Sequence, residues 1–328
     1  MAFSGINEAF GLMLPAGFVG GHGTAAAIGG VLAEVGWGDA STIGQTFATV
    51  GLLGGILLGV AFINVGARRG WTKVIKGVDV LPEEMLTGLV PEGKEAPLGK
   101  STTNGVSIDS LTWHACLVLV SVGMAYLVNE GLKAVLPGVS FPTYGLALLC
   151  GIVVQLVLKA VKLDANVDKE VITHIGSSAT DFLVVFGIAS IKVSVVVQYW
   201  MPIAILSVLG FLFVTAWFLL VSRYFFCNHW FEHGIYIFGM STGVLATGVI
   251  LLRITDPEFR TGVLEDFGLA WIVLSVMDAL LVAFAPVFVI AGQGIGFSLA
   301  LIVVSVAALV ACRLMFVRRA KVQGGRTV

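Results

Sequence analysis

The chain has 328 residues, of which 57% are hydrophobic and only 12% charged, with a formal net charge of −1. A soluble domain carries about 25% charged residues, so this composition excludes an ordinary soluble protein and, without any basic patch, a nucleic-acid binder. Several apolar stretches reach the ~20 residues that a helix needs to cross a bilayer. We therefore predict an all-α, polytopic membrane protein.

The predicted elements begin with a glycine-rich apolar segment at 11–34 and a span at 42–66. A polar stretch rich in Pro, Gly, Lys and Glu follows at 67–110 and is predicted as a linker. Further spans are predicted at 111–130, 142–161, 174–198 and 200–224. A second glycine-rich segment covers 234–254, and the last two spans are 268–290 and 294–317.

The basic residues orient these spans, because Lys and Arg collect on the cytoplasmic side of a membrane. Both the linker and the C-terminal tail are rich in them. A full crossing by 234–254 would place the tail on the opposite side from the linker. The charges therefore favour a re-entrant segment at 234–254, with the linker and the C-terminus in the cytoplasm.

Two glycine-rich motifs resemble each other. Residues 20–29 (GGHGTAAAIG) align with residues 239–248 (GMSTGVLATG), and the span that follows each has the opposite orientation. Weak internal similarity with inverted topology is typical of secondary transporters, and glycine-interrupted segments in matching positions indicate their binding sites. Freed amides suit a carboxylate. The predicted substrate-binding residues are Gly20, Gly21, His22, Gly23, Thr24, Ser241, Thr242 and Gly243.

Sodium is predicted to bind at hydroxyls of the same motifs and at carboxylates within the membrane. Ionisable side chains are costly inside a bilayer and are functional candidates for that reason. The predicted sodium ligands are Thr24, Thr242, Thr247, Asp278 and Asp181. Alternatives remain open: small residues also pack membrane helices, either aspartate can serve as a structural hydrogen-bonding group, and a neutral, hydrogen-bonded His22 fits better than a metal ligand.

One further motif indicates a different chemistry. His229, Glu232 and His233 match the H-x-x-E-H pattern of a class of zinc peptidases. The pattern is short, and Trp, His and Phe are ordinary anchors at a membrane boundary. We therefore keep a membrane metalloenzyme only as a minor alternative. No phosphate loop or dinucleotide fingerprint is present, so we expect neither a cofactor nor enzymatic activity.

The first motif carries a resemblance to a known family. Residues 20–26 (GGHGTAA) resemble the glycine-rich motif of the bacterial sodium/glutamate symporter family, and residues 12–19 and 48–55 are similar as well. Residues 239–257 resemble divergent members, and Asp278 falls where that family has an acidic residue. The resemblance implies two inverted five-helix repeats, each with a re-entrant segment. It also implies sodium and glutamate as partners, and a homodimer in the lipid bilayer.

This resemblance predicts a division of the chain. Residues 1–66 would be the remnant of a first repeat lacking roughly four helices, and 67–110 a cytoplasmic linker. Residues 111–290 would be the second repeat, and 291–328 an extra transmembrane helix with a basic tail. The expected function is a symporter that couples sodium influx to uptake of glutamate or a related amino acid or carboxylate. The alternatives are transport of another small anionic solute and a channel-like membrane protein.

Overall fold

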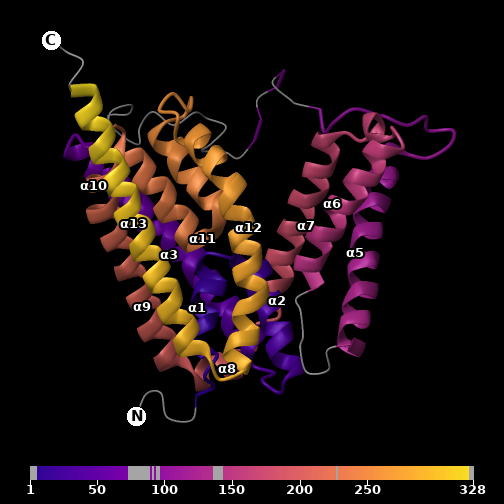
Figure 1. Ribbon diagram of the computed structural model, residues 1–328, viewed down its shortest axis with the longest axis horizontal. Helices are drawn as coiled ribbons and strands as arrows, with labels where there is room; N and C mark the ends of the chain where they lie inside the picture. Colours follow the sequence, from indigo (N-terminus) through magenta and orange to yellow (C-terminus); the bar gives the residue numbers. More distant parts are fainter. Residues whose placement is uncertain are drawn as a thin grey trace.

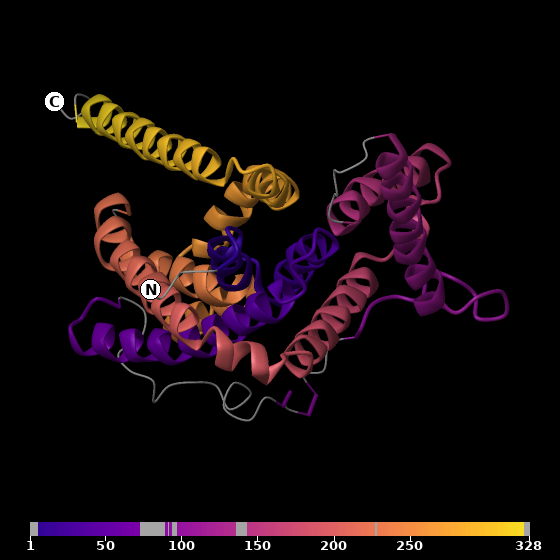
Figure 2. The same ribbon diagram turned by 90° about the horizontal axis from the view of Figure 1, so that it is seen from below.

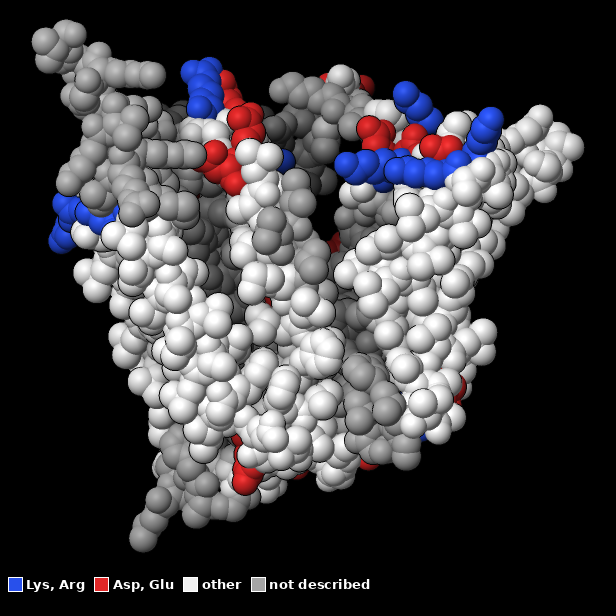
Figure 3. Space-filling view, in the orientation of Figure 1, with Lys and Arg blue, Asp and Glu red and all other residues white. Residues whose placement is uncertain are grey.

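The computed structural model describes residues 6–72, 89–90, 92–93, 97–135, 143–226 and 228–324. These residues form helices and no strand, and six of the helices are long and apolar enough to cross a membrane. The predicted all-α polytopic fold is thereby confirmed. In the space-filling view, charged side chains gather at the two ends of the helices, with a band of uncharged surface between them (Figure 3).

The N-terminal part is a helical hairpin packed on a long helix. Helix α1 (Phe10–Phe18) and helix α2 (Gly21–Glu34) lie against α3 (Ala40–Arg68) in the lower half of Figure 1. The ring of Phe10, at the start of α1, lies 6.2 Å from that of Trp37, just beyond the end of α2. The start of α1 and the end of α2 therefore lie at the same end of the molecule, and α3 then runs to the other end (Figure 1).

A second group of helices stands to one side. It comprises α5 (Ser110–Val135), α6 (Thr143–Ala160), the short η2 (Asp164–Asn166) and α7 (Lys169–Ala189). Figures 1 and 2 both show this group beside the other helices; α7 packs against α2 and α3, and α6 also contacts α12. Of the predicted linker, residues 73–88, 91 and 94–96 lie outside the described residues.

The start of α7 is fixed by its N-cap residue. Asp168 accepts hydrogen bonds from the amides of Glu170 and Val171, as N-cap carboxylates do. Its other oxygen accepts from the amide of Lys100 at 3.3 Å, and its own amide donates to His114 Nε2 at 2.7 Å. The described end of the linker is therefore held against the α6–α7 turn.

The chain continues with α8 (Val193–Gln198), α9 (Trp200–Ala216), the π-helical turn η3 (Trp217–Ser222), α10 (Arg223–Phe225), α11 (Trp230–Thr255), α12 (Val263–Ile290) and α13 (Gly294–Gly324). The continuous span predicted at 174–198 is wrong. Helix α7 ends at Ala189 with Ser190 as its C-cap residue, and the extended backbone of Lys192 separates it from α8.

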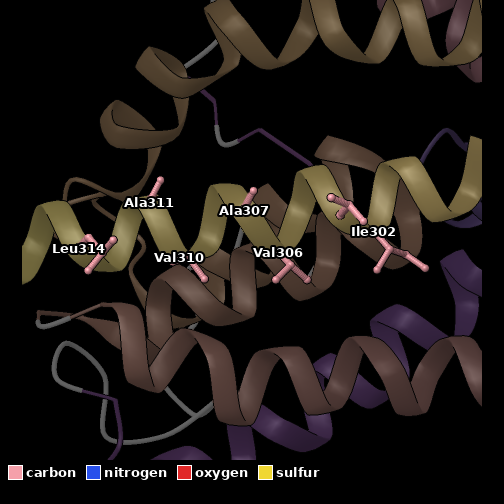
Figure 4. A pocket seen from close by; sticks show the side chains of 7 residues that line it. Ile302, Val306, Ala307, Val310, Ala311 and Leu314 are labelled. Atoms are coloured by element: carbon pink, nitrogen blue, oxygen red, sulfur yellow. The ribbon is translucent and has the colours of Figure 1, made fainter.

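Helix α13 covers the span predicted at 294–317. It packs against α12 (Figure 2), and the guanidinium group of its Arg313 lies over the ring of Tyr224 of α10, 4.1 Å from the centroid. An open groove of about 540 Å³ runs along it, lined only by apolar side chains (Figure 4). These are Ile302, Val303, Val306, Ala307, Val310, Ala311 and Leu314. A groove without polar groups offers nothing to bind a charged solute, so the candidate site lies elsewhere.

Candidate functional site

Helix α11 folds back on itself at the second glycine-rich motif. Gly243 and Val244 have non-helical backbone angles, and Val244 has a φ of 63°. A β-carbon on Gly239 would lie 2.8 Å from the Cα of Gly248, whereas nine residues of straight helix would separate them by about 13 Å. The two halves of α11 therefore form a tight antiparallel hairpin, which we call the second hairpin.

Contacts at the base of the second hairpin agree with this. Near its start, His233 Nε2 lies 3.1 Å from Asp266 Oδ2 of α12, although α12 begins only after the hairpin has ended. The rings of Tyr236 and Phe267 are 4.8 Å apart. Both ends of the second hairpin thus lie at the same end of the molecule. Its re-entry into a membrane from that side remains a prediction.

The tips of the two hairpins meet. The first hairpin turns between α1 and α2 at Gly21, which has a φ of 66°, in the left-handed region that suits glycine. The side chain of Val244, at the turn of the second hairpin, occupies the place where a β-carbon of Gly21 would be. The two motifs that the sequence singles out, more than two hundred residues apart, are therefore in direct contact.

Helix α3 supports both tips. Its Gly51 and Gly55 face Thr242 so closely that a β-carbon at either position would overlap the threonine. Small residues allow helices to approach in this way. Thr242 and Gly243 are buried, as are Gly21 and His22, whereas Gly23, Thr24 and Ser241 are half-buried. The tips thus form a closed junction at mid-height on α3.

The first tip presents hydrogen-bond donors. A helix leaves its first amides without intrahelical acceptors. In α2 these are the amides of Gly21, His22 and Gly23, because the amide of Gly20 already donates to the Pro15 carbonyl. Free amides at the positive end of a helix dipole attract a carboxylate. The carboxylate site at Gly20–Thr24 stays a prediction.

A short hydrogen-bonded chain fixes His22 next to these amides. Its Nε2 lies 3.1 Å from Thr49 Oγ1, and the Thr49 hydroxyl donates to the Gln45 carbonyl at 2.9 Å. Since the one hydroxyl proton is used there, Nε2 of His22 must carry the ring proton and donate to Thr49. Gln45 Nε2 in turn donates to the His22 carbonyl at 3.1 Å.

The second tip presents acceptors. The hydroxyl of Thr242 donates to the Phe238 carbonyl at 2.9 Å, and that of Thr247 donates to the Gly243 carbonyl. Each hydroxyl therefore donates its proton to a carbonyl of its own helix, and its oxygen lone pairs remain available as acceptors. The amides of Ser241 and Thr242 lie inside the helix, so they do not offer the free donors that we expected for a carboxylate at 241–243.

The two predicted aspartates are not part of this junction. Asp181, on α7, and Asp278, on α12, are both exposed. Neither has a hydrogen bond or ion pair with another residue that the structure describes. Asp181 lies two residues from Leu183, whose side chain approaches Gly23. A role for either aspartate in sodium binding stays a prediction.

The predicted zinc motif lies at the base of the second hairpin. His233 is bonded to Asp266 and stacks on Phe226 with ring centroids 4.4 Å apart. Glu232 is fully buried. Across the described part of the chain, no three His, Cys, Asp or Glu side chains are arranged to hold a metal ion. The metalloenzyme alternative therefore gains no support.

Sequence reasoning missed Gln45 and Thr49. Both lie in the apolar stretch 42–66, four residues apart and so on one face of α3, where they meet the first tip. The signal was available, because polar side chains inside a membrane span need partners.

The sequence profile of the family described as Sodium/glutamate symporter matches residues 2–231. This range includes the first hairpin, α3 and the helices through α10, and it ends within the first turn of α11. Neither a curated protein nor a solved structure matches the chain. With most of its length matched and several helices long and apolar enough to cross a membrane, this chain is a multi-pass membrane protein and belongs to the sodium/glutamate symporter family.

Proposed function

We propose that this protein couples sodium influx to the uptake of glutamate or a related amino acid or carboxylate. The family match supports sodium and glutamate as the transported pair. The observation that carries the proposal is the junction of the two hairpin tips, at which Gly21 meets Val244. Broken helices that meet in this way release backbone donors and acceptors to ligands, as secondary transporters require.

The junction gives the two ligands different surroundings. The substrate carboxylate binds at the first amides of α2, and sodium binds at oxygens of the second tip, where Thr242 and Thr247 offer lone pairs. Transport follows when the fully loaded junction changes the side that it faces more readily than a half-loaded one. We place the protein in the inner membrane as a homodimer, with the upper end of Figure 1 in the cytoplasm.

Uptake into vesicles tests this proposal. Purified protein in liposomes, given an inward sodium gradient, should accumulate labelled glutamate, and potassium in place of sodium should abolish the accumulation. Thr242→Val should weaken sodium activation by roughly tenfold or more, because valine has no oxygen to coordinate the ion, and we take this loss to be comparable to that of a hydrogen bond to a charged group. Thr173→Val is the matched control, because its hydroxyl makes the same bond to the carbonyl four residues earlier on the exposed face of α7.

The outcomes separate the alternatives. Correctly inserted protein without sodium-stimulated uptake of glutamate or of other amino acids and carboxylates would reject the symporter. Passive flux that does not depend on a gradient would favour a channel. If Thr242→Val and Thr173→Val were equally active, the assignment of sodium to the second tip would be wrong.

A further inference from the structure

Gln45 of α3 has a buried acceptor without a partner. Its side chain is 2% exposed, and its Oε1 makes no hydrogen bond. The amide orientation is fixed, because Nε2 donates to the His22 carbonyl at 3.1 Å. Buried polar atoms are nearly always hydrogen-bonded, and an exception calls for an explanation such as a ligand that is bound only part of the time.

The unpartnered oxygen points at helix α7. A β-carbon on Gly187 would lie 2.6 Å from Gln45 Oε1 and 3.1 Å from His22 Cδ2, so only a glycine fits over this pair. Helix α7 is also the element through which the α5–α6–α7 group packs on α2 and α3. Whether the oxygen is covered therefore depends on where that group sits relative to the first hairpin.

We propose that Gln45 Oε1 is a ligand for a cationic group of the transported set, either sodium or the ammonium group of an amino acid, and that α7 covers it at Gly187. An amide oxygen suits both, because each needs acceptors and offers no lone pair. Gln45 is bonded to His22, whose own amide belongs to the free first turn of α2. A cation at Oε1 would thus lie beside the carboxylate predicted there. The inference rests on the proposed function and adds a residue to it.

Three variants separate the acceptor from the donor. Gln45→Ala removes both, whereas Gln45→Glu keeps oxygen acceptors at the same position. Gln155→Ala, on the exposed face of α6, is the control for a lost glutamine. In detergent, the rise in melting temperature with sodium and no substrate reports sodium binding. In liposomes, competition of labelled glutamate by unlabelled glutamate and by glutarate, which lacks the ammonium group, reports substrate binding.

If the ligand is sodium, Gln45→Ala should require roughly tenfold more sodium for the same thermal shift. If the ligand is the ammonium group, the sodium shift stays unchanged, glutamate competes roughly tenfold more weakly, and glutarate competes as before. In either case Gln45→Glu keeps the wild-type response. If Gln45→Ala binds sodium and glutamate like the wild type in both assays, the inference is overturned. It is also overturned if Gln45→Glu binds as weakly as Gln45→Ala, because the effect would then come from the lost hydrogen bond to His22. Failure of the proposed function is distinct, because it would appear in the wild-type protein as uptake without sodium stimulation.

Discussion

The second hairpin makes a sharp prediction for Gly239. In Gly239→Ala, the added β-carbon would lie 2.8 Å from the Cα and 2.9 Å from the amide nitrogen of Gly248, against 3.4 Å for ordinary contact. Both neighbours are backbone atoms, so the two halves must separate by about half an ångström. Overpacking of this kind costs about 1–3 kcal/mol. Alanine recovers about 0.5–1 kcal/mol through its helix propensity, which leaves a net loss of about 0–2.5 kcal/mol.

The control is Gly123→Ala on α5, where a β-carbon would meet nothing within 4 Å. It should be neutral or more stable by up to about 1 kcal/mol. Thermal unfolding in one detergent, followed by tryptophan fluorescence, should therefore give a lower melting temperature for Gly239→Ala than for Gly123→Ala. Sodium-driven uptake should fall only in the former, because the tip moves with the hairpin. Equal stabilisation by both substitutions would show that α11 is straight and would refute the hairpin.

Two further predictions concern α7. Gly187→Ala should slow uptake without preventing folding, because its β-carbon would push α7 away from Gln45. The control is Gly176→Ala on the same helix, whose β-carbon would meet nothing within 4 Å and which should transport normally. Equal uptake rates of the two variants would contradict the proposal that α7 covers Gln45 at Gly187. Asp168→Ala should lower the melting temperature at pH 7, because the amides of Val171 and of its other donors hold the pKa of Asp168 below its ordinary 3.8. A carboxyl group with a depressed pKa stabilises the fold above pH 3.8, and this effect is lost as the pH falls through the pKa of the folded state. The difference in melting temperature between Asp168→Ala and the wild type should therefore shrink towards about pH 3. A difference that does not change with pH would exclude the carboxylate as the cause.

The fold follows closely from hydropathy. The spans predicted from the apolar stretches correspond to helices in the structure, because ~20 apolar residues leave a membrane chain almost no other way to satisfy its backbone. The break between α7 and α8 escaped prediction, because hydropathy does not register the extended backbone at Lys192 that separates these two apolar helices. The site was predictable in outline only. Two glycine motifs indicate where chains turn, and inverted topology predicts that they meet.

The details of the junction depend on packing and not on residue type. Thr242 and Thr247 are the expected hydroxyls, but only the structure shows that they donate to their own helix and so act as acceptors. Gln45 became a candidate because α7 happens to place a glycine over it. The aspartates were chosen for the cost of placing charge inside a bilayer; the structure places both on the surface of their helices, and a sodium-binding role for Asp181 and Asp278 stays a prediction.

The close fit between α3 and the second hairpin has a consequence for biosynthesis. Gly51 and Gly55 leave the ribosome long before Thr242, the residue that covers them. At about 5–20 residues per second, translation of the intervening chain takes roughly 10–40 s. Throughout that interval Gly51 has only Phe18 of α1 beside it and Gly55 has no neighbour, so any earlier apolar helix can occupy the uncovered part of this face. We therefore expect the inserted nascent chain to depend on the membrane insertion machinery to keep this face vacant until α11 arrives.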